Sequence, residues 1–197
     1  SEKMVDSLNK ALNRREVVKR ILKDRVNCLV VSGLGSPTYD VHAAGDNDKN
    51  FYLWGGMGGA AMVGLGLAIA RPEKNIIVLT GDGGQLMGMG SLATISVQKP
   101  KNLMVIVLDN EHYGETGVQE SHTFHNVDLV GIAKASGCPK SLLITDQNDL
   151  NHLLKLKRTL SCFTFAVIKV SKEIEPRSIP IVDGSKIKAR FKKALVQ

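Results

Sequence analysis

VLTGDGGQLMGMG, residues 78–90, is the segment that indicates most directly how this chain folds. The continuous apolar run at 76–79 leads to a lone aspartate, Asp82, which lies between glycines and precedes a segment of helical character. Apolar runs without alternation indicate strands that are buried on both faces, as in parallel sheets. The stretch therefore predicts a buried strand, a turn that presents a carboxylate on a permissive backbone, and a helix.

The same order of strand and helix repeats along the chain. Besides 75–84, expected strands cover residues 27–33, 50–56, 102–110 and 163–170, and expected helices cover 13–23, 57–70, 86–98, 128–136 and 149–160. This alternation predicts βαβ units, so we expect an α/β fold: an open, doubly wound parallel sheet with helices on both faces.

The composition fits a single soluble domain, with 197 residues of which 43% are hydrophobic and 23% charged. We expect a polar N-terminal extension at 1–12, the sheet domain at 13–182, and a basic C-terminal helix or tail at 183–197. Much of the net charge of +7 lies near the two ends, without interleaved aromatic residues. This favours small anionic ligands and argues against nucleic acid.

The cysteines point to a reducing compartment. Cys28, Cys138 and Cys162 are widely spaced and odd in number, so we expect reduced thiols in a cytoplasmic protein. The sequence contains neither a signal peptide nor an apolar run of roughly eighteen residues, so we expect neither export nor a membrane span.

Three expected strand ends are polar and rich in glycine, at 32–37, 81–84 and 109–117. Ligands of open parallel sheets bind outside the carboxyl ends of the strands, so these loops should converge on one site. Asp82 and Asn110 each end an apolar strand, and oxygen ligands of this kind suit Mg²⁺. The pattern indicates a diphosphate held through a metal ion. The alternative is that Asp82 only caps a helix beginning near Leu86.

The pattern GDG, twenty-odd residues and then Asn resembles the diphosphate-binding domain of thiamine diphosphate enzymes. Within these enzymes the chain is most similar to the β subunit, or C-terminal half, of sulfopyruvate and phosphonopyruvate decarboxylases. The likeness covers about residues 13–170 and includes NFYLWGGMG, GLGLAIARPEK and YGETGVQESHT.

The resemblance implies a set of site residues. Asp82, Asn110 and the backbone carbonyl of His112 correspond to the ligands of Mg²⁺. The remaining positions that correspond to cofactor contacts are Gly33, Ser36, Gly55, Gly56, Met57, Gly81, Gly83, Gly84, Tyr113 and Gly114. Met57 corresponds to the wedge beneath the bent cofactor, a role that suits its adaptable apolar side chain. The chain departs from the pattern at Pro37, where a basic residue is frequent, and at Gly84, where serine is frequent.

The resemblance also implies a reaction and a partner. The family decarboxylates 2-oxo acids to aldehydes, with the cofactor carrying the chemistry. Its activating glutamate lies on a pyrimidine-binding domain, for which the chain has no second α/β unit; Glu111, Glu115 and Glu120 lie on the wrong loop. We therefore expect this glutamate on a partner α subunit, in a homodimer or an α/β hetero-oligomer.

No catalytic residue of this chain is assigned by the resemblance. His122, in the SHT segment, is a candidate contact for an anionic substrate, whereas His125 fits a solvated loop.

Several alternatives remain open. GGMGGA, residues 56–61, fits the G-x-G-x-x-A pattern of nicotinamide-binding domains, with Asp82 as the ribose ligand. The chain could also be a cofactor-holding subunit without catalysis. Within the family, a phosphonopyruvate decarboxylase or an acetolactate-type carboligase subunit is possible.

Overall fold

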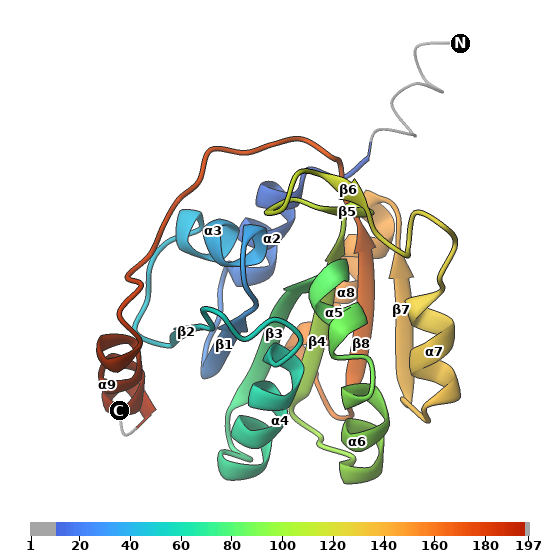
Figure 1. Cartoon of the computed structure of the whole chain (residues 1–197). Coiled ribbons are helices and arrows are strands. Elements are labelled where there is room, and N and C mark those ends of the chain that lie inside the picture. Colours follow the sequence, from blue (N-terminus) through green and yellow to red (C-terminus); the bar gives the residue numbers. More distant parts are fainter. Residues whose placement is uncertain (1–10, 196–197) are drawn as a thin grey trace.

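The computed structural model describes residues 11–195, which form an α/β domain around a parallel sheet (Figure 1). The strands of this sheet, in spatial order, are β2 (Asn50–Tyr52), β1 (Cys28–Ser32), β3 (Asn75–Gly81), β4 (Leu103–Asp109), β8 (Thr164–Lys169) and β7 (Lys140–Ile144). All neighbouring pairs run parallel. The predicted α/β class and doubly wound sheet are confirmed.

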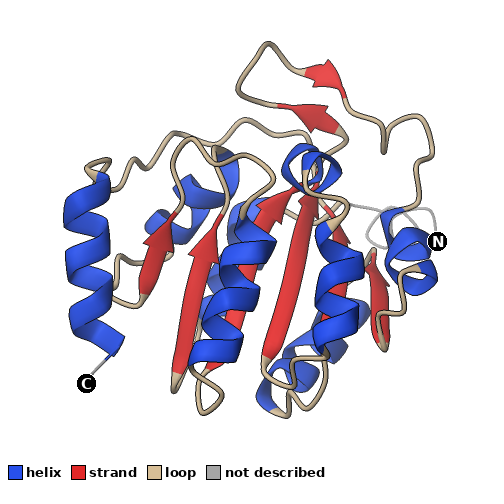
Figure 2. Ribbon diagram, turned by 60° about the horizontal axis from the view of Figure 1, so that its bottom comes forward, coloured by secondary structure: helices blue, strands red, loops and turns tan. Residues whose placement is uncertain are grey.

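Helices cover both faces of the sheet (Figures 1 and 2). The helices are α2 (Arg14–Leu22), α3 (Ser36–Ala43), α4 (Ala60–Ala70), α5 (Asp82–Met87), α6 (Ser91–Gln98), α7 (Leu129–Ala135), α8 (Gln147–Arg158) and α9 (Gly184–Leu195). One face carries α2, α3 and α8, and the other carries α4, α6 and α7. Within residues 11–195, none of these helices is both long and apolar enough to cross a membrane.

Successive side chains of each strand point to opposite faces of the sheet and belong to two separate apolar cores. In β3, Ile77 and Leu79 pack with α2 and α8, whereas Ile76 and Val78 pack with α4 and α6. Every residue of β4 is buried. This two-sided burial is why the strands read as continuous apolar runs in the sequence.

The predicted helix at 86–98 is wrong in its extent, because α5 and α6 are two short helices separated at residues 88–90. The break lies where two backbones meet: a Cβ on Gly88 would stand 2.1 Å from the carbonyl oxygen of Gly58. Sequence analysis also missed α3, β7 and a small hairpin of β5 (His112–Tyr113) and β6 (Gln119–Glu120).

Most of the expected N-terminal extension, residues 1–10, lies outside the described residues. Leu12 is buried and bridges to Val170 beside β8. At the other end, the expected basic helix forms as α9, and it buries an apolar side against β2. The rings of Phe51 and Phe191 meet there edge to face, 5.3 Å between centroids.

The order of the strands determines where a ligand can bind. The chain moves outward from β1 to β2 and then crosses back to place β3 on the other side of β1. Loops leave β1 and β3 in opposite directions at this point, which opens a crevice at their carboxyl ends.

Candidate functional site

A cavity of about 790 Å³, including the space open at its mouth, lies at this crevice. Its walls come from the loops after β1, β3 and β4, so the predicted convergence of the three polar strand ends is confirmed. The predicted cofactor and metal residues that line it are Gly33, Ser36, Met57, Gly81, Asp82, Gly83, Gly84, Asn110, His112, Tyr113 and Gly114.

Asp82 is the buried carboxylate of this cavity, with 2% of its surface exposed. The alternative in which it caps a helix beginning near Leu86 is wrong, because α5 begins at Asp82 itself and Gly81 is its N-cap. Burial raises the pKa of Asp82 to about 6; the hydrogen bond from Ser121 lowers it, and the nearby negative charge of Asp109 raises it. A carboxylate held in this way lacks a positive partner, and a cation would supply one.

A chain of hydroxyl groups connects Asp82 to Asp109. Ser121 donates to Asp82, Thr123 donates to Asp109 across 2.7 Å, and the two hydroxyl oxygens lie 2.9 Å apart. Two hydroxyl protons cannot serve all three contacts when both carboxylates are ionised. With each hydroxyl proton directed at a carboxylate, the contact between the two hydroxyl oxygens has no proton of its own.

Asp109 has a positive partner of its own. Lys169 donates to Asp109 across 2.8 Å and to Glu111 across 2.6 Å. Burial opposes the charge of Lys169, but these two bonds outweigh it and raise its pKa. The lysine therefore neutralises Asp109, and of the two neighbouring buried carboxylates only Asp82 faces the cavity.

Asn110 and His112 form a tight turn at the end of β4. The side-chain oxygen of Asn110 accepts from the backbone N–H of His112 across 3.2 Å. The imidazole Nδ1 of His112 donates to the backbone oxygen of Asn110 across 2.9 Å. The ring is thus engaged with the backbone, which agrees with the expectation that His112 contributes a carbonyl rather than its side chain.

Two glycines of the cavity are required by packing against Thr80. A Cβ at Gly84 would stand 2.7 Å from the hydroxyl of Thr80, and one at Gly33 would stand 2.9 Å from it. A side chain at Gly83 would meet the ring of Tyr113 at 2.5 Å. Backbone is therefore exposed to the cavity where the resemblance places the diphosphate. At the start of α3 on the same wall, Pro37 has no N–H and the N–H of Thr38 donates to the carbonyl of Gly35, so Ser36 is the residue of this turn whose N–H remains for a ligand.

The structure separates the three predicted cofactor contacts Gly55, Gly56 and Met57. Met57 lines the cavity, and its methyl group lies near Gly83. Gly55 and Gly56 are not among the lining residues. Gly55 has a φ of +71° with open space beside it, and Gly56 packs on Leu53.

Arg14 is a lining residue that sequence analysis missed. It is buried at the start of α2, where its Nε donates to Asp40, and Arg15 donates to the other oxygen of the same carboxylate. An arginine in the first turn of an amphipathic helix carries no sequence signal that separates it from a solvated one. Only the fold brings it to the cavity wall.

Glu115 is a second such residue. It lies on the turn between β5 and β6, where its carboxylate accepts from Tyr39 across 3.3 Å and pairs with Arg177 across 3.4 Å. Its side chain also covers Gly35, at the start of α3. The hairpin is thereby fastened over one side of the cavity.

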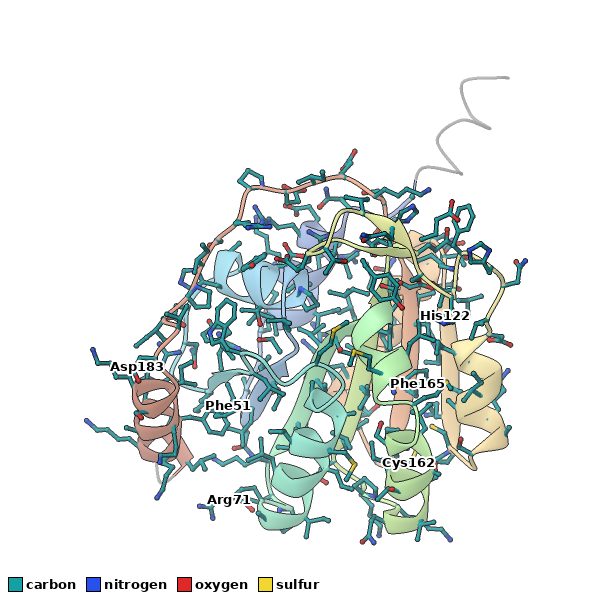
Figure 3. All side chains as sticks on the ribbon, in the orientation of Figure 1. Phe51, Arg71, His122, Cys162, Phe165 and Asp183 are labelled. Carbon is teal, nitrogen blue, oxygen red and sulfur yellow. The ribbon has the colours of Figure 1, made fainter. Side chains whose placement is uncertain are left out.

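His122 lies outside the lining but next to it. Its Nδ1 is 3.3 Å from the hydroxyl of Tyr113, and Figure 3 places it at the carboxyl end of the sheet. His125 is exposed and pairs with Glu120, as expected for a solvated loop. Cys162 lies at the opposite end of the sheet (Figure 3), and all three cysteines are free.

The donor set fits a hard divalent cation. Among residues 11–195, no three His, Cys, Asp or Glu side chains gather as a metal cluster. Asp82 and Asn110 instead offer one carboxylate and one amide oxygen, which suit Mg²⁺ when phosphate and water complete its shell. The glycine backbone and the α3 terminus suit the diphosphate.

Comparison with known proteins places the chain among relatives of one family. A family model described as "Thiamine pyrophosphate enzyme, C-terminal TPP binding domain" matches residues 39–170. The chain is 35% identical over 186 residues to sulfopyruvate decarboxylase subunit beta of Methanococcus maripaludis, covering 93% of this chain and 98% of that protein. It is 41% identical over 125 residues to the subunit of the same name from Methanocaldococcus jannaschii, covering 63% of this chain and 66% of that protein.

Longer relatives match this chain over part of their length. Phosphonopyruvate decarboxylase of Streptomyces viridochromogenes is 40% identical over 125 residues, covering 64% of this chain and 31% of that protein. The solved structure of benzoylformate decarboxylase from Polynucleobacter necessarius superposes with a TM-score of 0.63 at 20% identity, over 82% of this chain and 33% of that one. The latter likeness concerns the fold.

Proposed function

Because this chain belongs to the thiamine pyrophosphate enzymes, as their C-terminal cofactor-binding domain, we propose that it is the β subunit of a 2-oxo acid decarboxylase. The enzyme depends on thiamine diphosphate and Mg²⁺ and converts a small anionic 2-oxo acid of the sulfopyruvate type to an aldehyde and CO2. The observation that carries the proposal is the presence of Asp82 and Asn110 in one cavity, beside exposed glycine backbone.

The residues that would hold the cofactor follow from the lining. Asp82, Asn110 and the carbonyl of His112 would bind Mg²⁺, and the turn at 81–84 with the start of α3 would bind the diphosphate. When bound, thiamine diphosphate supplies the electron sink for the loss of CO2.

Other side chains of this chain would act on the surroundings of the reaction. Met57 and Tyr113 form an apolar wall that excludes water. The buried guanidinium of Arg14 supplies positive charge near the anionic ligands. His122, held beside the Tyr113 hydroxyl, would contact the anionic end of the substrate.

A partner chain completes the site in this proposal. The activating glutamate and the pyrimidine-binding domain would lie on an α subunit, in keeping with the subunit names of the relatives. The docking face would be the surface of α4, α5, the loop before α4 and the break at 88–90, where Met57, Met62, Met87 and Met89 are exposed. Methionine side chains adapt to varied apolar partners. The three free cysteines support a cytoplasmic location.

The decisive experiment is an aldehyde-release assay on the chain purified with its partner, across a panel of 2-oxo acids. We expect turnover that requires both Mg²⁺ and thiamine diphosphate, with sulfopyruvate the best substrate. Faster turnover of phosphonopyruvate would favour the second candidate, which the 40% identity to that decarboxylase supports. A cofactor-bound complex that releases no aldehyde from any 2-oxo acid would contradict the proposal and favour a non-catalytic subunit or a carboligase.

The nicotinamide alternative has less support. Its glycine motif lies at 56–61, and Gly58 of this motif lines the cavity that contains Asp82, but this alternative gives no role to Asn110 in the same lining. Fluorescence titration with NADH separates the two: saturable NADH binding without any response to thiamine diphosphate would contradict our assignment.

A further inference from the structure

Two buried hydroxyl groups flank His122 in the loop after β4. Ser121 has no exposed surface and Thr123 has 6%, whereas His122 between them is exposed. The two hydroxyl oxygens lie 2.9 Å apart on the buried side of the turn that begins at Ser121. Sequence analysis assigned this SHT segment to the substrate side, but its two hydroxyls contact carboxylates.

These hydroxyls join the loop to two strand ends. Ser121 donates to Asp82 at the end of β3, and Thr123 donates to Asp109 at the end of β4. The backbone N–H of Ser121 also donates to the carbonyl of Glu111 across 2.8 Å, which closes the loop on itself. Residues 121–127 then form a compact turn, held by bonds from Phe124 and later backbone N–H groups.

Few other groups orient the Asp82 carboxylate. Within residues 11–195, apart from Ser121 and the longer contact from Thr123, only the backbone N–H groups of Asp82 and Gly83 reach it. Groups that hydrogen-bond a ligating carboxylate fix its direction and tune its affinity for a metal ion. A free Asp82 side chain would have to lose rotational freedom whenever a cation binds.

We infer that Ser121 and Thr123 are positioning residues for the cation site. They orient Asp82 toward the cation and couple the loop at 111–127 to that carboxylate, so that cation binding and loop order reinforce each other. This inference rests on the proposed function, because the cation site belongs to it. A role confined to folding the loop predicts a different result: a looser loop with unchanged cation affinity.

The test uses the chain purified with its partner, with Mn²⁺ as a paramagnetic probe in the presence of thiamine diphosphate. Thr123→Val removes the hydroxyl at nearly constant shape, Ser121→Ala removes the other, and Thr123→Ser restores a hydroxyl. His125→Gln is the matched control, because this exposed side chain lies in the same turn. Free Mn²⁺ is measured by electron paramagnetic resonance, and hydrogen exchange is measured on peptides covering 111–127.

We expect Mn²⁺ to bind about tenfold or more weakly in Thr123→Val and Ser121→Ala. The 111–127 peptides should exchange faster in the same variants, and Mn²⁺ should slow exchange less than in the wild type. Thr123→Ser should restore both properties, and His125→Gln should change neither.

The outcomes separate the two proposals. Wild-type affinity in both hydroxyl-deleting variants, with or without faster exchange, would refute the positioning role and leave the proposed function standing. A wild-type complex that binds no Mn²⁺ would overturn the proposed function and this inference together. Circular dichroism checks that each variant is folded. If Thr123→Val does not fold, the comparison of Ser121→Ala and Thr123→Ser with the wild type still decides the test.

Discussion

Replacement of Asp82 by Asn should stabilise the ligand-free protein while it abolishes cation binding. The pKa of Asp82 rises from 3.8 to about 6 on folding, which corresponds to about 3 kcal/mol of destabilisation once the group is ionised. Since the folded pKa is raised, this cost is absent below about pH 4, grows as the pH increases, and is complete above about pH 6. An asparagine carries no charge, and its amide can donate the hydrogen that the Ser121–Thr123 chain lacks.

Urea denaturation of both proteins between pH 4 and pH 8, with EDTA present, measures this effect. The difference in unfolding free energy should be near zero at pH 4 and reach about 2–3 kcal/mol in favour of Asp82→Asn above pH 6. Asp146→Asn, an exposed N-cap of α8, is the control and should change stability by less than about 0.5 kcal/mol at any pH. With Mg²⁺ and thiamine diphosphate added, only the wild type should gain thermal stability. A variant less stable than the wild type at pH 7.5, or a difference that does not vary with pH, would refute the reasoning.

Three further predictions follow from other contacts. Gly84→Ala should lower the free energy of unfolding by about 1–2 kcal/mol in thermal melts, because its Cβ would stand 2.7 Å from the Thr80 hydroxyl. Thr80→Ala should remove that loss, and an equal loss from Gly84→Ala with Thr80 or Ala at position 80 would contradict the clash. Asp40→Ala should lower the free energy of unfolding by about 3–5 kcal/mol in urea denaturation, because it leaves Arg14 and Arg15 without their shared buried carboxylate. A loss below about 1 kcal/mol would show that these two ion pairs contribute little to stability. Met87→Glu should weaken co-purification of the partner subunit, whereas Val26→Glu, at an exposed apolar residue before the start of β1, should not. Equal recovery of the partner with both variants would place the docking face elsewhere.

The sequence was sufficient for five of the six strands of the parallel sheet, all except β7, and for the centre of the site. Strands that are buried on both faces are apolar at nearly every position, so β3 and β4 can be predicted from their own sequences without knowledge of the neighbouring strands. Parallel strands bring their carboxyl ends to one edge, and this rule alone places Asp82 beside Asn110. The glycines after β3 were predicted to form a turn, whereas Gly83 and Gly84 lie in the first turn of α5.

What the sequence could not reveal depends on contacts between distant segments. The break between α5 and α6 exists because Gly88 meets the backbone of Gly58, a contact without a local signal. The role of Thr123 required the positions of both Asp82 and Asp109, and Arg14 required the packing of α2 beside the cavity. In each case the residue type is common on the surface, and only the tertiary structure gives it a role.

The position of the cavity also has a consequence for how the subunit matures. Its walls come from loops that follow three separate strands, so no cofactor can be held until β1, β3 and β4 have all paired. A ligand that binds only the finished sheet draws the folding equilibrium toward it. A cofactor bound there would therefore raise the free energy of unfolding of the whole sheet, and its removal would lower it.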